Sequence, residues 1–464
     1  MTKSLLINAM QTKDAFTANG AVTHSTSGNA LLDLFAVAGA LRNNNEQQIL
    51  NLWTKAFHEN PEIALRMLLW IRDCRGGAGE RRTFRIIYKD LKERYPDAAR
   101  RVMAKIPLVG RWDDLFESGV VTDAELEMII ANLDNSLVCK WIPRKGEVFN
   151  RLCKMSKTPY GTFRRTVVAN SKTVEQLMSK REWGAIKYAG VPSRAMSIYS
   201  KAFGKHDPKG FADFMAKVEK GEAKINASAL FPYDLLRNYR QGKGRNVIDA
   251  QWKALPNYST KEENMLVLAD VSGSMLGAVH GNVAPMDGDV APMDVSVSLA
   301  IYISERNNGL FKDTFITFTD VPTLQVLKGS LTDRINQVQG PVGYSTNFIA
   351  AFELVLNAAV KNRVPQEEMP TKIIAISDME FNQCGGSTNF EAVKRKYENA
   401  GYQMPIMVFW NVNGRAGNSP VKMHDLNTCL VSGASPSIIP SILGESIDPY
   451  SVMMRTLDNE RYTL

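Results

Sequence analysis

Apolar residues recur at three- and four-residue spacing from about residue 28 to residue 220. This spacing predicts a series of amphipathic helices, among them LLDLFAVAGALR, EQQILNLWTKAFHE, PEIALRMLLWIRDC and ERRTFRIIYKDLKERY. Pro61 after Asn60 predicts a helix start, and the glycines at 76–79 predict a connection. Short helices joined by brief turns suggest stacked helical pairs, as in an α-solenoid. An irregular helical bundle explains the pattern equally well.

The period changes after about residue 264. Four short β-rich apolar runs follow, MLVLAD (265–270), DTFITFT (313–319), TKIIAIS (371–377) and PIMVFWN (405–411), with helical stretches near 293–306, 347–361 and 388–400 between them. Strands that alternate with helices predict βαβ units and a mostly parallel sheet. The sequence therefore predicts an α-helical domain over residues 1–255, followed by a Rossmann-like α/β domain over residues 256–464.

Oxygen-bearing side chains follow the predicted strands. Asp270-Val271-Ser272-Gly273-Ser274 comes at the end of the first strand, and Asp378 comes after the TKIIAIS strand. Thr346 lies between them in a loop that opens a helix. Residues at the carboxyl ends of parallel strands meet at one sheet edge. Carboxylates and hydroxyls are hard ligands, which suit Mg²⁺ or another divalent cation.

The D-x-S-x-S…T…D pattern resembles the metal-ion-dependent adhesion site of von Willebrand factor A domains, over about the last 200 residues. The resemblance implies that Ser272, Ser274 and Thr346 ligate the cation directly or through water, with Asp270 and Asp378 beside them. The alternative is that Asp270 and Ser272 only cap the following helix, which leaves Thr346 and Asp378 unexplained. The insert LGAVHGNVAPMDGDVAP carries Asp287 and Asp289, which we interpret as part of a solvated lid rather than as ligands.

The charge is divided unevenly along the chain. The net charge of +8 is the sum of +15 over residues 1–260 (41 Lys+Arg, 26 Asp+Glu) and −7 over residues 261–464 (15 Lys+Arg, 22 Asp+Glu). A basic first half favours a polyanionic partner, whereas the acidic second half suits a cation or a protein.

Basic residues are densest between residues 140 and 209, where 16 Lys+Arg stand against 4 Asp+Glu and aromatic residues are interleaved. This composition is typical of nucleic-acid binding, and it favours RNA because no helix-turn-helix or zinc finger is visible. For the aromatic residues we prefer the simpler interpretation that they belong to the core. The charge density selects as RNA-binding candidates Lys140, Arg144, Lys145, Arg164, Arg165 and Lys172.

The combination of a HEAT-like helical domain and a von Willebrand A domain resembles the Ro autoantigen (TROVE-domain) ring proteins, and most closely the Ro-like proteins of phages, bacteria and plants. The segments that carry this resemblance are TANGAVTHSTSGNALLDLF (17–35), VGRWDDLF (109–116), KWIPRK (140–145), VPSRAMSIYSKAF (191–203), KINASALFPYDLL (224–236) and DVSGSM (270–275). The resemblance implies helical repeats that can close into a ring, single-stranded RNA ends in a basic hole, and structured small RNAs on the outer face.

These observations predict a non-catalytic RNA-binding scaffold for small non-coding or misfolded RNA. Two alternatives stay open: a Mg²⁺-dependent adaptor that grips an acidic side chain of a protein partner, and a metal-dependent nuclease or phosphatase. The last is disfavoured because Ser272 occupies the place of the second aspartate of aspartyl phosphatases, and no G-x-S-x-G or GK[ST] motif occurs.

The sequence predicts a cytoplasmic protein without a membrane partner. It has no apolar run of bilayer-spanning length and no recognisable signal peptide. Its five cysteines form no CxxC pair, which fits a reducing compartment; they are Cys74, Cys139, Cys153, Cys384 and Cys429.

Overall fold

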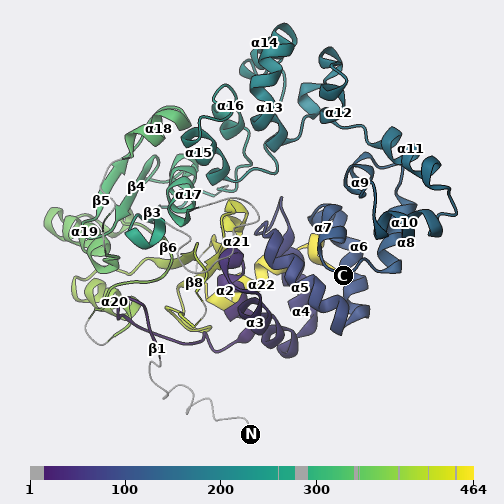
Figure 1. Ribbon diagram of the computed structural model, residues 1–464. Coiled ribbons are helices and arrows are strands. Elements are labelled where there is room, and N and C mark those ends of the chain that lie inside the picture. Colours follow the sequence, from purple (N-terminus) through teal and green to yellow (C-terminus); the bar gives the residue numbers. More distant parts are fainter. Residues whose placement is uncertain are drawn as a thin grey trace.

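The computed structural model describes residues 15–259, 261–276, 291–338, 343, 345–384, 387–415, 417–444 and 447–464. Asp287 and Asp289, predicted to belong to a lid, lie outside these residues. The described chain combines a helical region with a mixed sheet made mainly of parallel strands, which confirms the predicted fold class at this level (Figure 1).

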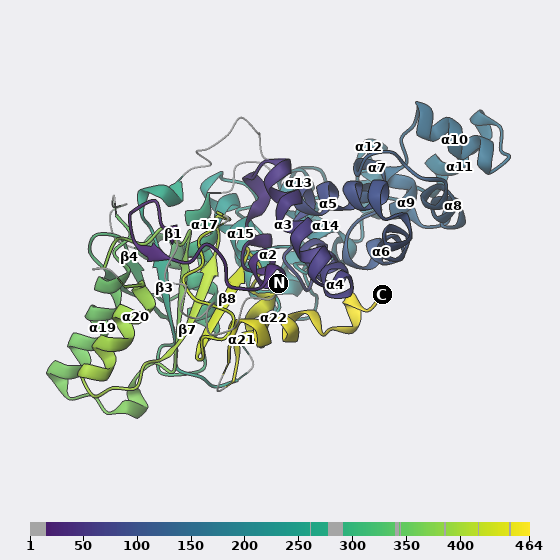
Figure 2. The same cartoon turned by 90° about the horizontal axis from the view of Figure 1, so that it is seen from below.

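The helical region describes an arc that begins and ends at the sheet (Figure 1). Consecutive helices pack as neighbours, α3 with α4, α5 with α6 and α13 with α14. In both views α8–α11 lie farthest from the sheet, and the chain then returns so that α15 packs on α17 (Figures 1 and 2). The helices of the arc are α3 (Glu46–Glu59), α4 (Pro61–Arg72), α5 (Arg81–Arg94), α6 (Pro96–Val109), α7 (Asp113–Glu117), α8 (Asp123–Ala131), α9 (Ser136–Trp141), α10 (Glu147–Met155), α11 (Tyr160–Asn170), α12 (Val174–Ser179), α13 (Ser193–His206), α14 (Pro208–Glu219), α15 (Pro232–Arg240) and α16 (Ile248–Lys253).

Asparagine side chains begin the first helices of the chain. Asn29, Asn45 and Asn60 each accept a hydrogen bond from a backbone N–H in the first turn of α2 (Ala30–Ala38), α3 and α4. These bonds satisfy donors that have no partner within the helix. Pro61 stands at the first position of α4, as its fixed φ favours.

The sheet has the strand order β5-β4-β3-β6-β7-β8, and β5 alone among its described strands runs antiparallel to its neighbour. The strands are β3 (Met265–Asp270), β4 (Thr314–Phe318), β5 (Thr323–Val326), β6 (Lys372–Ser377), β7 (Ile406–Asn411) and β8 (Thr428–Ser432). All six residues of β3 and of β6 are buried, as expected for central parallel strands. Helix α17 (Pro292–Arg306) packs on β3, β4 and β6, whereas α19 (Phe348–Asn362) contacts β4 and α20 (Asn389–Asn399) packs on α19.

The first described residues pack against the end of the sheet instead of starting the helical arc. Helix α2 lies on β8 together with α22 (Pro449–Leu457). The Ser432 hydroxyl donates to the carbonyl of Phe35 at 2.7 Å and accepts from the N–H of Gly39 at 3.0 Å. A Cβ on Gly39 would lie 2.6 Å from the Ser432 carbonyl, so glycine permits this close approach. The division at residue 255 stays a prediction; the structure adds that the helical arc is anchored to the sheet at both of its ends.

Two hydrophobic clusters hold the described chain together. The larger one runs without interruption from α2–α11 into the sheet and its helices. A smaller cluster is centred on α13 and α14 and includes Met196, Phe203 and Phe211. No described helix is long and apolar enough to cross a membrane.

A buried carboxylate joins α4, α5 and α7. Asp114 is fully buried, and its Oδ2 accepts from Arg72 Nε at 2.6 Å and from the backbone N–H of Arg111 at 3.0 Å. Its Oδ1 accepts from Arg85 Nε at 2.9 Å. A Cβ on Gly110 would lie 2.6 Å from Asp114 Oδ2, so glycine leaves room for the carboxylate. Asp114 thus neutralises two arginines that would be unfavourable to bury alone.

Replacing Asp114 with alanine should lower the free energy of unfolding by roughly 3–5 kcal/mol, because the buried Arg72 would lose its charge partner inside the protein. Arg85 would keep its contact with Asp113 at 3.1 Å. Urea unfolding measures the change. The control is Asp97→Ala, which removes a partner of Arg100 at 3.6 Å from a carboxylate that is 94% exposed, and which should change stability by less than about 1 kcal/mol. Equal effects of the two variants would contradict the assignment.

Candidate metal centre and arginine cluster

Three loops meet at the carboxyl ends of β3, β4 and β6. Asp270 is the last residue of β3, and Asp378 follows β6, which pairs directly with β3. Ser272 forms an isolated bridge with Gly343, and the N–H of Gly273 donates to the Gly343 carbonyl at 2.7 Å. The parallel register of β3 and β6 therefore brings the DVSGS segment, the loop before α19 and the loop after β6 to one edge of the sheet.

The hydroxyl groups predicted as ligands lie next to one another. Ser272 Oγ is 3.1 Å from Ser274 Oγ, and Thr346 Oγ1 donates to Ser272 Oγ at 3.2 Å. Ser272 and Thr346 are buried, whereas Ser274 is exposed. Asp270 and Asp378 are both fully buried behind these hydroxyls. The structure thus brings together all five residues predicted for the site, with Ser274 on the solvent side.

Two buried oxygen atoms at this edge have no hydrogen-bond partner among the residues that the structure describes. Asp378 Oδ2 and Thr319 Oγ1 are buried and accept or donate no hydrogen bond, while Asp378 Oδ1 accepts from the N–H of Glu380 at 3.2 Å. A buried carboxylate oxygen without a partner is unfavourable, and a cation or a water molecule would satisfy it. No group of three or more His, Cys, Asp or Glu side chains suited to a metal occurs among the described residues. The available donors are two carboxylates and several hydroxyls, which fit a hard cation such as Mg²⁺.

Three residues that were not selected from the sequence also support this edge of the sheet. Ser377 donates its hydroxyl to Asp270 Oδ2 at 2.5 Å. Gly343 is required by packing, because a Cβ there would lie 1.5 Å from Thr319 Oγ1. Asn382 accepts from the N–H of Thr346 at 3.1 Å. Ser377 and Asn382 flank Asp378 in the sequence, so proximity to the motif was the available signal.

The N-terminal segment 17–24 lies along the loop that follows β6. Thr17 donates its hydroxyl to the carbonyl of Phe381 at 2.7 Å, and Asn19 donates its amide to the carbonyl of Glu380 at 2.6 Å. Gly20 forms a bridge with Asn382. Since Asn382 also holds the backbone of Thr346, this segment supports the candidate metal centre from outside.

The charge of Asp270 is disfavoured at this site. Burial, and then repulsion from Asp378, raise the pKa of Asp270 to about 7, although hydrogen bonds from Ser377 and Ser272 oppose the shift. Two carboxylates in a dry edge bind a divalent cation favourably, because the cation offsets their repulsion.

The six basic residues selected from charge density lie on and around α9–α12, and two of them make contacts within the described chain. The Lys140 ammonium pairs with Glu175 at 2.9 Å. Arg144 donates to the Ser171 hydroxyl at 2.9 Å, and burial together with repulsion from Arg164 lowers its pKa. The remaining four are exposed on and around α10–α12, namely Lys145, Arg164, Arg165 and Lys172.

The interleaved aromatic residues mainly form core, as the simpler interpretation expects. Phe163, Tyr188 and Phe203 are buried. Trp183 stacks on His206 with ring centroids 4.5 Å apart, whereas Tyr160 is 44% exposed and meets Phe149 edge-on at 4.8 Å.

Three arginines from distant parts of the chain do converge, and we call them the arginine cluster: Arg81, Arg111 and Arg194. Arg81 begins α5, Arg111 precedes α7, and Arg194 lies in the first turn of α13. Burial first, and then repulsion from Arg81, lower the pKa of Arg111; attraction to Asp113 opposes the shift, and Arg194 and Arg72 add smaller repulsions. No carboxylate in the described ranges lies within ion-pair distance of the Arg111 guanidinium.

The arginine cluster is a half-buried concentration of positive charge. Arg194 lies 3.4 Å from Asp234, and the backbone of Arg111 is fixed by Asp114. Guanidinium groups held together in this way favour an anion such as phosphate, whose oxygens accept bidentate hydrogen bonds from a planar guanidinium. This site could not be predicted from the sequence, because the three residues are far from one another along the chain.

Comparisons with known proteins match families whose function is not described. Residues 264–459 match a "Domain of unknown function (DUF7788)", and residues 17–107 and 161–263 match a "Domain of unknown function (DUF2828)". The chain is also similar to the "Uncharacterized protein L728" of Acanthamoeba polyphaga mimivirus, with 25% identity over 96% of this chain and 87% of the relative. The match to a von Willebrand A domain stays a prediction from the motif.

Among solved structures, the chain is similar to the RO (RSR) protein of Deinococcus radiodurans. The match covers 94% of this chain and 93% of the other, with 12% sequence identity and a TM-score of 0.35.

The raised pKa of Asp270 predicts how stability depends on pH in the metal-free protein. Its folded pKa of about 7 lies above the unfolded value of about 3.9. The folded protein therefore holds a proton that the unfolded chain has released, and this contribution to stability is lost as pH rises from about 4 to 7. Asp270→Asn stays neutral, so in EDTA it should gain stability relative to the native protein at pH 8 but not at pH 4. The same difference in unfolding free energy between Asp270→Asn and the native protein at pH 4 and pH 8, measured by urea unfolding, would contradict the raised pKa of Asp270.

Proposed function

We propose that this protein is a non-catalytic, Ro-like RNA-binding scaffold that holds single-stranded RNA against the arginine cluster. The observation that carries the proposal is the convergence of Arg81, Arg111 and Arg194. The half-buried guanidinium of Arg111 has no ion-pair partner in the described ranges. An RNA phosphate placed there would relieve the mutual repulsion of the three charges.

The charge distribution supports RNA as the partner. The first 260 residues carry a net charge of +15, and four of the selected cations are exposed on and around α10–α12. Long-range attraction from such a surface accelerates the encounter with a polyanion and makes binding dependent on salt. The exposed cations would contact the RNA backbone without selecting a sequence.

The metal site has a separate role in the proposal. Ser272, Ser274 and Thr346 would hold Mg²⁺ or another divalent cation, with Asp270 and Asp378 providing the negative charge. The bound ion would act as a Lewis acid that accepts an oxygen ligand. The residues of this chain fix the three loops at the sheet edge and keep the two carboxylates dry.

A second candidate function is favoured by the exposure of Ser274. Because this hydroxyl faces solvent while the carboxylates are buried, the open side of the site is available to an acidic side chain of a protein partner. In this adaptor function the metal site, and not the arginine cluster, recruits the partner. Pull-down of a protein that requires Mg²⁺ and resists ribonuclease would distinguish it from RNA scaffolding.

Arg111→Gln should weaken the binding of single-stranded RNA by roughly tenfold, because one charge-assisted contact to phosphate is lost. The slope of log K against log salt should fall by about 0.7 between about 50 and 200 mM salt. Fluorescence anisotropy measures both quantities. The matched control is Lys361→Gln on α19, an exposed lysine at the end of the molecule opposite α8–α11 (Figures 1 and 2).

The Arg164→Glu, Arg165→Glu double variant tests the exposed cations separately. If they contact RNA, the variant should lose affinity in the same assay. Equal affinity of the native protein and Arg111→Gln at all salt concentrations would exclude the arginine cluster, and absence of any RNA binding at moderate salt would overturn the whole proposal.

Adding Mg²⁺ should raise the melting temperature of the native protein, because a ligand that binds only the folded state stabilises it. An excess of about 100 times the dissociation constant corresponds to about 2.7 kcal/mol. Asp378→Asn and Thr346→Val should abolish this increment, whereas Thr332→Val on α18 (Leu331–Gln337) should retain it. An unchanged melting temperature of the native protein on addition of Mg²⁺ would contradict Mg²⁺ binding at the candidate metal centre.

A further inference from the structure

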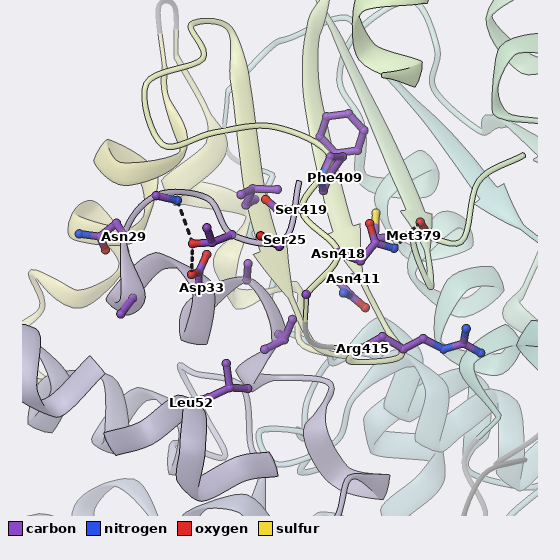
Figure 3. A pocket seen from close by; sticks show the side chains of 18 of the residues that line it. Ser25, Asn29, Asp33, Leu52, Met379, Phe409, Asn411, Arg415, Asn418 and Ser419 are labelled. Atoms are coloured by element: carbon purple, nitrogen blue, oxygen red, sulfur yellow. Dashed lines mark hydrogen bonds between the residues drawn. The ribbon is translucent and has the colours of Figure 1, made fainter. Parts of the chain in front are cut away.

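A cavity of about 670 Å³ separates the N-terminal segment from the carboxyl ends of β7 and β8. One wall is formed by residues 25–37 and α3, and the other by the sheet and the loop after β7. Figure 3 shows Ser25, Asn29 and Asp33 on the side of the N-terminal segment, and Phe409 and Asn411 of β7 and Asn418 of the following loop on the other side. The volume lies in the range of small-molecule sites, and ligands of parallel α/β sheets bind at this edge.

The floor of the cavity is apolar and fixed. It contains Val37 and Leu52 from the helices and Phe409 and Leu430 from the strands. Phe409 stacks on Phe348 with ring centroids 6.0 Å apart, so its ring is held from behind. A rigid apolar floor of this kind suits a flat ring.

Two asparagines stand at the polar side of the cavity. The Asn418 amide is fixed by donating to the Met379 carbonyl at 2.9 Å and by accepting from the Thr23 hydroxyl at 2.9 Å. Asn411 is more than nine-tenths buried, and its Oδ1 accepts from the N–H of Asn413 at 3.0 Å. This bond orients the Asn411 side chain and leaves its NH₂ group without a partner among the described residues. Side-chain amides at a fixed orientation match the hydrogen-bonding edge of a nucleobase.

The available charge at the cavity is positive. Asp33 already accepts from the Ser27 N–H at 2.6 Å and from the Thr26 hydroxyl, so its carboxylate is engaged. Arg415 is 36% exposed and uses one nitrogen to pair with Glu380 at 3.3 Å. Lys55 from α3 is exposed on the opposite wall and has no ion pair within the described ranges. The two cations favour an anionic group at the mouth of the cavity.

We propose that this cavity binds a nucleoside monophosphate unit, with its base on the floor beside Phe409, its polar edge at Asn411, and its phosphate toward Arg415 and Lys55. The unit comes either from a free nucleotide or from the terminal nucleotide of an RNA, and the second source rests on the proposed RNA-binding function. The arginine cluster is a different site on other elements, so the two assignments fail independently.

Isothermal titration with the four nucleoside 5′-monophosphates tests the site on the full-length protein. At least one should bind saturably, and Arg415→Gln should weaken it by about tenfold, which corresponds to about 1.4 kcal/mol. Ala36→Phe should abolish binding by filling the cavity; its melting temperature checks folding, and Arg415→Gln carries the test if that variant does not fold. Lys394→Gln, at an exposed lysine on α20, is the matched control and should bind as the native protein does.

The source of the nucleotide follows from competition. Displacement of the bound monophosphate by a short RNA with a terminal phosphate identifies the RNA end as the source, and lack of displacement identifies the free nucleotide; both results support the site. Arg111→Gln should leave monophosphate binding unchanged even where it reduces RNA affinity. The proposal is overturned if no monophosphate binds at millimolar concentration, if inorganic phosphate binds equally well, or if Arg415→Gln and Ala36→Phe both bind like the native protein.

Discussion

The buried carboxylate of Asp114 is the contact on which the helical arc depends. It joins α4, α5 and α7 by accepting from Arg72 and Arg85, and it also fixes the backbone of Arg111. The buried ion pair of Arg72 and the backbone of Arg111, a candidate binding residue, therefore share Asp114 Oδ2 as their acceptor. This arrangement explains the segment VGRWDDLF, in which Gly110 makes room for Asp114, Asp113 pairs with Arg85 at 3.1 Å, and Leu115 is buried.

The candidate metal centre depends on a different constraint, which is the parallel direction of the central strands β3 and β6. Because β3 and β6 run parallel and pair directly, the residues that follow them lie side by side whatever the intervening chain does. Asp270 and Ser377 are 107 residues apart in the sequence, and Asp378 follows Ser377, yet both aspartates are buried at one edge of the sheet. Mutual repulsion of the two carboxylates is thus a consequence of the fold.

The sequence predicted the elements whose signal is local. β3, β4, β6 and β7 and the three helices between them were located within about two residues, because each is a continuous apolar run or an amphipathic period. Two strands, β5 and β8, were not predicted. In β5 the apolar residues Leu324 and Val326 are exposed on an antiparallel edge, and β8 is a five-residue run bounded by Thr428 and Ser432.

The same difference between local and distant signals separates the two candidate sites. The five residues of the candidate metal centre were selected because they form the D-x-S-x-S…T…D motif. Their role as ligands stays a prediction. Charge density along the chain selected Lys140 and Arg144, which the fold uses for contacts with Glu175 and Ser171. The arginine cluster was missed because only tertiary packing brings Arg81, Arg111 and Arg194 together.

The contact of α2 with β8 has a consequence for how the protein is made. Gly39 and Ser432 are 393 residues apart in the chain and touch in the finished fold. At a synthesis rate of roughly 5–20 residues per second, the segment that contains α2 emerges from the ribosome tens of seconds before its binding surface exists. During that interval its apolar face, including Leu31, Leu34 and Phe35, has no native partner, so newly made chains are candidates for protection by a chaperone.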